Sequence, residues 1–165
     1  MKKRVLIILM ISIVFGFATG YSLHHWIHPA RFPEEKIMLM PEHPFYLMEE
    51  VNEEVLYNTL KHYDFPSPAI ITAQAVLESG NFKSKLCKDN NNLFGLYNSR
   101  TMSYFKFDSW ISCVFAYKQF ILSRYDPEED YYRFLDRIGY AEDSLYESKV
   151  KELELDIINK YGSPD

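Results

Sequence analysis

Apolar residues recur at helical spacing in several separate segments of the chain beyond residue 50. Asn52 precedes the first segment, whose apolar side continues until Pro66 interrupts it. Ser67 and Pro68 predict the start of a second helix, because serine can accept the first free amide hydrogens and proline fits the first helical position. This second helix is apolar on nearly all sides up to Gly80, which predicts a central position in a helical domain.

The helical pattern then breaks before it resumes. Two short extended runs, 93–97 and 102–107, are joined by the turn sequence NSRT after an asparagine-rich loop, so we expect a small β-hairpin. Three further helices are predicted beyond it. Their starts are assigned to Asp108 or Ser109, to a capping box of Asp126, Pro127 and Glu129, and to Asp143 or Ser144. The sequence therefore predicts one mainly α domain over residues 50–165.

The N-terminal segment has a different pattern. Basic residues at positions 2–4 precede an uncharged apolar run over 5–23, which is typical of an export signal. The run nearly reaches the roughly 20 residues that span a bilayer, so a cleaved signal peptide and an uncleaved membrane anchor over 1–23 are both open. Residues 24–49, rich in proline and histidine, are expected to form a linker. In either case the domain is predicted to work outside the cytoplasm.

Charge and cysteine content narrow the class of function. The net charge of −5 argues against a nucleic-acid partner, and removal of the basic N-terminus makes the rest more acidic. Cys87 and Cys113 allow a disulfide, but Cys113 falls on an apolar helix stripe, where a buried free thiol is the alternative. We expect no metal, no cofactor and no amidase chemistry, because a cysteine nucleophile would need His62 near the cleft.

Glu78 is the candidate catalytic residue. It lies one turn after Gln74, in the last turn before Gly80, at the end of the apolar helix. Low-dielectric surroundings and the partial negative charge of a helix C-terminus both oppose ionisation, so we expect a raised pKa. A carboxylic acid that stays protonated near neutral pH can protonate a leaving oxygen in glycoside hydrolysis. Taken alone, Glu78 is better interpreted as an ordinary surface glutamate at a helix terminus.

Aromatic and amide side chains are predicted to line the substrate site. Tyr97 and Tyr104 of the hairpin, together with Gln74 before Glu78, are assigned to sugar binding, because such surfaces stack sugar rings and hydrogen-bond to them. Composition alone favours the alternative, in which the aromatic side chains of the hairpin belong to the hydrophobic core.

Three segments in order, AQAVLESGNFKSKL, NNLFGLY and GYAEDSLYESKV, resemble the glucosaminidase domain of bacterial peptidoglycan hydrolases. The sequence of these segments is most similar to that of glucosaminidase domains from Bacteroides-type bacteria, which implies a periplasmic location. The resemblance implies a lysozyme-like, mostly α fold with a small hairpin beside the cleft, and cleavage of the β-1,4 bond after N-acetylglucosamine. It also implies roles for Glu78 as general acid, Tyr140 near the reacting sugar, and Asn92 and Phe94 in shaping the cleft floor and holding the hairpin.

One departure from the family pattern affects the mechanism. Many members are thought to draw a second carboxylate from the hairpin, whereas residues 93–107 contain neither Asp nor Glu. Asp108 and Asp143 are candidate substitutes, though both are more simply helix caps. We therefore expect the substrate's acetamido oxygen to assist, with Glu78 as acid and then base and Tyr140 steadying the developing charge. The alternatives are a lytic transglycosylase and a membrane-tethered protein that binds glycan without turnover.

Overall fold

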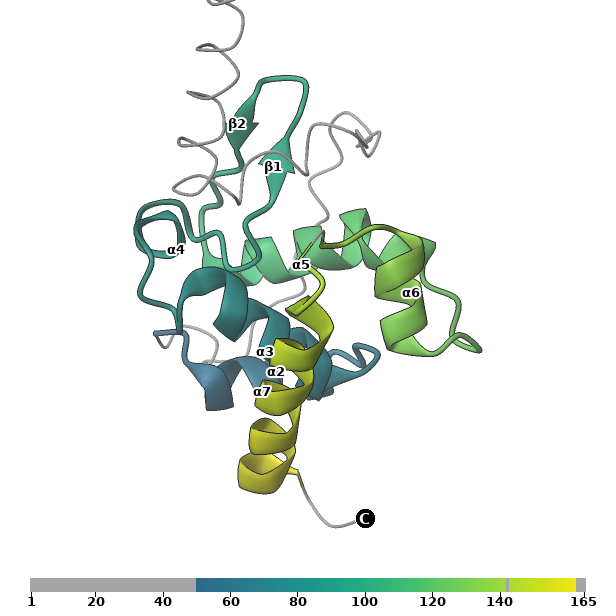
Figure 1. Cartoon of the computed structure of the whole chain (residues 1–165). Coiled ribbons are helices and arrows are strands. Elements are labelled where there is room, and N and C mark those ends of the chain that lie inside the picture. The colour runs from purple at the N-terminus through teal and green to yellow at the C-terminus, as the bar shows by residue number, and fades with distance from the viewer. Residues whose placement is uncertain (1–49, 142, 163–165) are drawn as a thin grey trace, which may run out of the picture. The chain divides into compact units, whose positions relative to one another are not determined.

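Six α-helices, the 3₁₀ helix η3 Leu122–Arg124 and one short hairpin form the regular structure of the residues that the computed structural model describes, 50–141 and 143–162 (Figure 1). The helices are α2 Glu53–His62, α3 Pro68–Ser79, α4 Lys85–Asn90, α5 Trp110–Phe120, α6 Tyr131–Arg137 and α7 Tyr146–Tyr161. The antiparallel strands are β1 Tyr97–Asn98 and β2 Ser103–Tyr104. The predicted mainly α domain with a small hairpin is confirmed, whereas the predicted export segment and linker lie outside the described residues. Within those residues no helix combines the length and apolarity needed to cross a bilayer.

Local signals account for several helix ends. The Asn52 side chain accepts a hydrogen bond from the Val55 amide at 3.0 Å and begins α2 as predicted. The Ser109 hydroxyl accepts from the Ser112 amide at 3.2 Å and begins α5. Gly80 ends α3 in the left-handed conformation, with φ 59°, which a side chain would disfavour. These three helix ends could be predicted from the sequence, because each capping residue lies within one turn of the backbone groups that it satisfies.

Three local predictions are corrected. Ser67 has φ 47° and makes no side-chain cap bond, so Pro68 alone marks the start of α3. The predicted capping box at 126–129 is wrong, because those residues form a turn and Asp130 caps α6 instead. Part of the predicted asparagine-rich loop is the short helix α4, which Ser84 caps through its hydroxyl.

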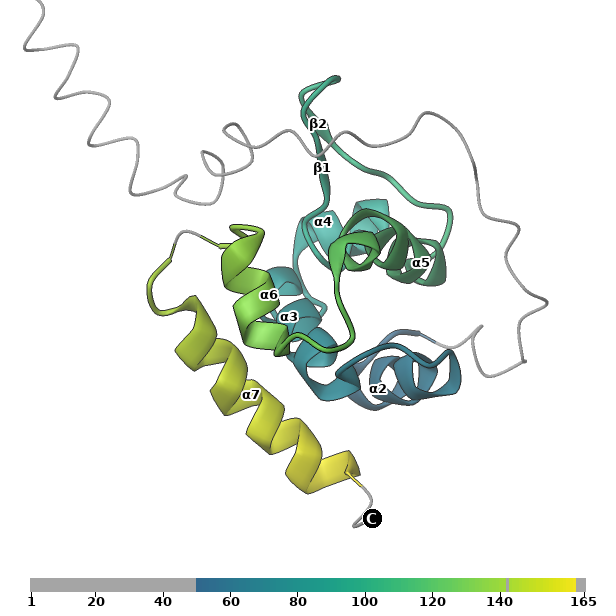
Figure 2. The same ribbon diagram turned by 90° about the vertical axis from the view of Figure 1, so that its right-hand side faces the viewer.

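Helix α3 occupies the centre of the domain. It packs most extensively against α7 and then against α2, and both views show α7 beside it (Figures 1 and 2). Its buried positions occur on every side of the helix and are Ile70, Ile71, Thr72, Ala73, Gln74, Ala75, Val76 and Ser79. The central position predicted from the all-round apolar pattern is confirmed, and it brings the end of α3 into the interior.

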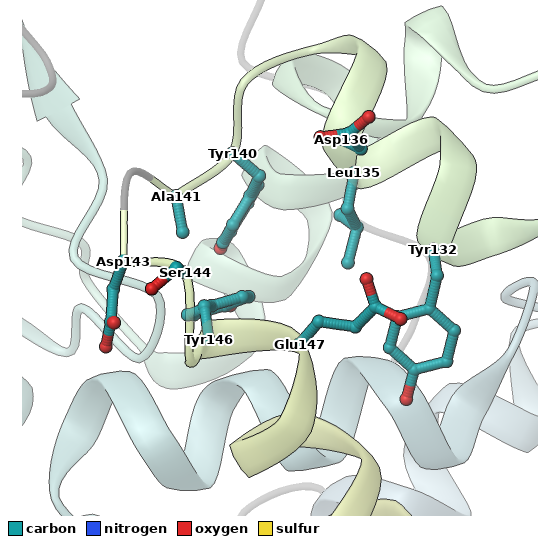
Figure 3. A pocket seen from close by; sticks show the side chains of 9 residues that line it. All are labelled: Tyr132, Leu135, Asp136, Tyr140, Ala141, Asp143, Ser144, Tyr146 and Glu147. Carbon is teal, nitrogen blue, oxygen red and sulfur yellow. The ribbon is translucent and has the colours of Figure 1, made fainter.

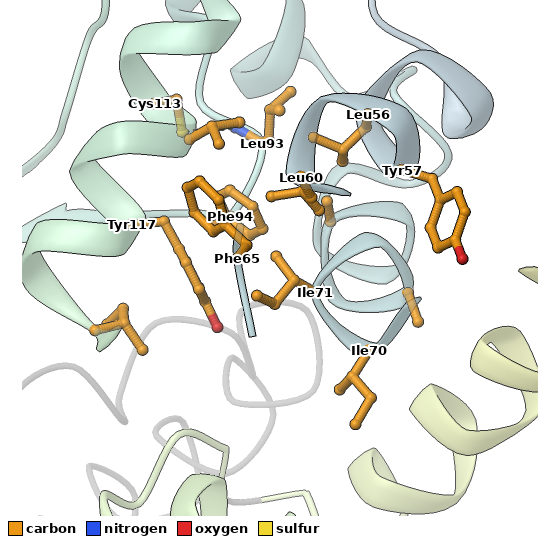
Figure 4. Close-up of a cluster of buried hydrophobic side chains, with 14 of the residues drawn as sticks. Leu56, Tyr57, Leu60, Phe65, Ile70, Ile71, Leu93, Phe94, Cys113 and Tyr117 are labelled. Carbon is orange, nitrogen blue, oxygen red and sulfur yellow. Dashed lines mark hydrogen bonds between the residues drawn. The ribbon is translucent and has the colours of Figure 1, made fainter. Parts of the chain in front are cut away.

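The main core fills the space between α2, α3 and α5 (Figure 4). Leu60 of α2 and Ile71 of α3 are fully buried there, and Leu93 and Phe94 enter from the segment before the hairpin. The Phe94 ring lies against the Tyr117 ring of α5, with 4.2 Å between centroids. For Phe94 the structure therefore gives a core position, which was the alternative interpretation of the aromatic residues.

A buried amide holds the hairpin in place. The Asn92 side chain donates hydrogen bonds to the carbonyl oxygens of Leu96 at 2.8 Å and Phe105 at 3.0 Å, and accepts one from the Leu96 amide at 2.8 Å. Its role in holding the hairpin fits this geometry, whereas its 1% exposure leaves no surface for the predicted substrate contact.

Both cysteines are free thiols in the structure, which fits the buried-thiol alternative. Cys113 is completely buried, with its sulfur 3.9 Å from the Asn92 side-chain oxygen, and burial raises the pKa of its thiol to about 12. Cys87 is also buried, and burial raises its pKa too. Burial thus keeps both cysteines in the thiol form, which is a poor nucleophile.

Candidate active site

Glu78 stands in the last turn of α3, where it is partly buried as the sequence predicted. Burial raises the pKa of its carboxyl from 4.5 to about 7, and a hydrogen bond with Tyr146 acts in the opposite direction. The expected rise in pKa is therefore confirmed, with loss of hydration as its cause. The carboxyl is present in both protonation states near neutral pH, which suits a group that must first donate a proton and later accept one.

One side of the carboxylate is covered by backbone from the segment before the hairpin. Gly95 has φ 62°, and a Cβ built on it would lie 3.8 Å from the Glu78 Oε2 atom. Two residues that precede Gly95 are anchored in the core, namely Asn92 and Phe94. The rigid loop that they hold thus brings main chain, and not a second acid, up to the carboxylate.

Phenol side chains from two other parts of the chain approach the same carboxyl group. Tyr146, the first residue of α7, hydrogen-bonds to Glu78. Tyr140 lies in the turn between α6 and α7, where its amide donates to the Leu135 carbonyl at 2.9 Å. Its ring centroid lies 5.7 Å from that of Tyr146 and 6.4 Å from that of Tyr117. Burial, followed by neighbouring phenols and Glu78, raises the pKa of Tyr140 and keeps it a neutral hydroxyl.

Gln74 lies one turn before Glu78 and connects two of these phenols. The Tyr117 hydroxyl donates to its side-chain oxygen at 2.9 Å, and its side-chain nitrogen donates to the Tyr146 oxygen at 3.2 Å. Gln74 has no exposed surface, so the substrate contact predicted for it does not fit this structure. Its position inside the phenol network replaces that prediction with a structural role.

The hairpin tyrosines form a pair outside the core. Tyr97 and Tyr104 are cross-strand partners, with their ring centroids 5.2 Å apart in an edge-to-face arrangement. Tyr104 is 37% exposed. Both rings are thus available at the surface of the hairpin, and their contact with sugar stays a prediction.

Neither candidate for a second carboxylate acts on Glu78 in the structure. Asp143 is exposed, accepts from the Leu145 amide at 2.9 Å and pairs with Lys149 at 2.6 Å. These contacts lower its pKa and lie in the turn before α7, whose N-terminus at Leu145 has no side-chain cap, so the predicted cap at Asp143 or Ser144 is wrong. Asp108 is exposed just before the Ser109 cap. Within the described residues, burial and the Tyr146 bond are the causes of the Glu78 shift, with no contribution from a charged neighbour.

A cavity of about 240 Å³ opens between α6 and the start of α7 (Figure 3). Its lining residues are Tyr132, Leu135, Asp136, Tyr140, Ala141, Asp143, Ser144, Tyr146 and Glu147. Tyr140 and Tyr146 belong both to this cavity and to the phenols beside Glu78. The cavity is smaller than typical ligand clefts of about 300–1,000 Å³, so it can take only part of a glycan.

Sequence reasoning missed Tyr117 and Tyr146 as parts of the site. Both stand at apolar helical spacing in the sequence, a pattern that is typical of core residues. The available signal was chemical, since a tyrosine in a buried stripe needs a partner for its hydroxyl. Among the described residues, no three histidine, cysteine or acidic side chains gather in a way that could hold a metal ion.

Comparison with known proteins gives one match. A family model described as Glucosaminidase, mannosyl-glycoprotein endo-beta-N-acetylglucosaminidase, matches residues 54–162. The matched range runs from α2 to just past α7 and contains Glu78, Tyr140 and the hairpin. No curated protein and no solved structure matches the chain.

Proposed function

The chain belongs to the glucosaminidase family, and from this premise we propose that it hydrolyses the β-1,4 bond after N-acetylglucosamine in peptidoglycan glycan strands. The observation that carries the proposal is the carboxyl of Glu78, which is partly buried among neutral phenols and has its pKa raised to about 7. A large fraction of an acid of this strength is protonated at neutral pH and can donate its proton to the leaving oxygen. We also propose that the reaction takes place outside the cytoplasm, because the uncharged N-terminal run is typical of an export signal, and in the periplasm, which the resemblance to Bacteroides-type sequences implies.

We further propose that the substrate's own acetamido oxygen attacks the anomeric carbon while Glu78 protonates the departing oxygen. Glu78, now ionised, then takes a proton from the water that opens the cyclic intermediate. Support for this route comes from the hairpin sequence, which offers no carboxylate to serve as nucleophile. The main chain at Gly95 beside Glu78 Oε2 is consistent with it.

Tyr140 is the proposed electrostatic partner in this reaction. Within the described residues its hydroxyl makes no hydrogen bond, although the ring is fixed against Tyr117 and Tyr146. Because burial keeps the hydroxyl neutral, it can orient the acetamido group or steady the charge that develops at the reacting sugar.

Digestion of purified peptidoglycan by the full chain tests the proposal. Wild type should release fragments with reducing-end N-acetylglucosamine, and Glu78→Gln should release none while binding peptidoglycan normally. Glu147→Gln is the matched control, because Glu147 is an exposed acid that lines the nearby cavity. Anhydromuramyl ends in the mass spectrum would instead show a lytic transglycosylase. Binding without cleavage by wild type would show a glycan-binding protein.

A further inference from the structure

Gly95 lies beside the carboxyl of Glu78 and leaves a gap between them. A Cβ atom built on Gly95 would lie 3.8 Å from the Glu78 Oε2 atom, which is an ordinary van der Waals distance. Apart from the two chain neighbours of Gly95, that oxygen is the one described atom within 4 Å of this position. Glu78 and Gly95 are both partly exposed. The described part of the protein therefore leaves this space beside Oε2 unfilled, and a side chain at position 95 would occupy it.

The backbone conformation of Gly95 does not by itself require a glycine in this chain. Its φ of 62° lies in the left-handed region, which glycine adopts without strain. Asn81, with φ 56°, and Asn91, with φ 50°, adopt the same region although they have side chains. The other property of glycine, its lack of side-chain volume, therefore distinguishes position 95 from these two positions.

The loop around Gly95 is fixed on both sides. The Asn92 side chain donates to the Leu96 carbonyl and accepts from the Leu96 amide, each at 2.8 Å. Phe94 is buried against Tyr117. Because the residues before and after Gly95 are anchored, a side chain added there could not move away with the backbone. It would stay beside Oε2 and cover it.

The Gly95 side of Glu78 is separate from the cavity between α6 and α7. The described residues that line that cavity all lie within 132–147, whereas Gly95 belongs to the segment that leads into β1 (Figure 1). In the proposed function Tyr140 of the cavity acts on the acetamido group of N-acetylglucosamine. The sugar whose oxygen leaves then needs room on another side of the carboxyl. In peptidoglycan this leaving sugar is the bulkier one, because it bears a lactyl ether next to the leaving oxygen.

We propose that Gly95 is a substrate-contacting residue, across whose Cα atom the leaving sugar lies so that its oxygen reaches Oε2 of Glu78. The inference deepens the proposed function and rests on it for the role of Glu78 and the order of the sugars. The proton passes from Oε2 to the leaving oxygen while the bond between that oxygen and the anomeric carbon breaks, and the electron pair of the bond stays with the oxygen. A side chain at position 95 would hold the sugar away from Oε2. A displacement of about 1 Å at a reacting centre can cost about a hundredfold in rate.

Two alanine variants of the full chain separate the loss of space from the strain of the backbone. Gly95→Ala puts a methyl group beside Oε2, whereas Gly80→Ala puts one at φ 59° with nothing described within 4 Å. Both should lower the melting temperature by a similar amount, about 4–8 °C, because alanine is strained in the left-handed region. Cleavage of peptidoglycan should fall about a hundredfold in Gly95→Ala and stay within about threefold of wild type in Gly80→Ala. An equal loss of cleavage in the two variants would overturn the proposal, as would near-normal cleavage by Gly95→Ala.

Gly95→Asn provides a second variant in which strain and volume predict opposite results. Asparagine tolerates the left-handed region better than alanine does, but its side chain is larger. Gly95→Asn should therefore melt at a higher temperature than Gly95→Ala and yet cleave peptidoglycan no faster. If the asparagine variant cleaved faster than the alanine variant, backbone strain would explain the loss and the contact with the sugar would be rejected.

Glu78→Gln, assayed beside these variants, separates this inference from the proposed function. If Glu78→Gln were inactive while Gly95→Ala cleaved at a nearly normal rate, the proposed function would stand and the role of Gly95 would be rejected. If Glu78→Gln retained activity, the proposed function would fail, and with it the transfer of a proton from Oε2 across Gly95.

Discussion

Glu78→Gln is expected to stabilise the fold at high pH and to leave its stability unchanged at low pH. The pKa of Glu78 rises from 4.5 to about 7 on folding, because the carboxyl loses water. Between these two values the folded chain keeps a proton that the unfolded chain has released. The free energy of unfolding of wild type therefore decreases as the pH rises from about 4.5 to about 7. Glutamine has no charge to bury, so the variant does not show this decrease.

The size of the effect follows from the separation of the two pKa values. A separation from 4.5 to about 7 corresponds to about 3 kcal/mol at full effect, since one pKa unit is worth about 1.4 kcal/mol. Glu78 is only partly buried, and water that reaches it screens the effect, so we expect about 1–3 kcal/mol at pH 8. For a domain of this size that corresponds to a rise in melting temperature of about 4–12 °C.

Thermal unfolding followed by circular dichroism from pH 4 to pH 8.5 measures the difference between wild type and Glu78→Gln. The two melting temperatures should coincide near pH 4 and separate progressively up to pH 8. The control Glu147→Gln, at an exposed residue paired with Lys151, should show no such separation. A stability difference that is the same at every pH would refute the reasoning, because it would mean that Glu78 titrates alike in the folded and unfolded chains.

Two further predictions concern the residues around Glu78. Tyr140→Phe keeps the ring and should lower turnover about a hundredfold with an unchanged melting temperature, both measured on one preparation; turnover within about threefold of wild type would assign Tyr140 to packing. Asn92→Leu leaves the buried carbonyl oxygens of Leu96 and Phe105 without their donor, and should lower the free energy of unfolding by about 2–4 kcal/mol in urea titrations. A loss below about 0.5 kcal/mol would contradict this role of Asn92.

The candidate site was predictable only where its determinants are local. The apolar pattern of α3 and the stop at Gly80 placed Glu78 at a buried helix end, and from that position the raised pKa follows. The turn that carries Tyr140 could also be predicted, because a glycine such as Gly139 favours the end of a helix and follows the last turn of α6. The serine cap predicted at Ser67 was wrong, because the left-handed conformation that the chain adopts there turns the side chain away from a capping position.

Roles of site residues that depend on contacts between residues far apart in the sequence could not be predicted from the sequence. Gln74 was expected to bind sugar through its amide, and the family resemblance implied that Asn92 shapes the cleft floor. Both side chains are buried and bonded to polar groups of the protein itself. A buried amide must satisfy its donors and acceptors, but nothing near it in the sequence says whether a sugar or another side chain does so.

The sequence by itself determined most of the helices of this protein, the buried acid at the end of α3 and the family to which the chain belongs. These depend on residues within a few turns of one another, or on motifs in a fixed order. Only the tertiary structure decided what surrounds the acid, because Tyr117 and Tyr146 reach Gln74 across 43 and 72 positions of the chain. Periodicity shows that such tyrosines are buried, but the partner of each hydroxyl is set by how the helices pack.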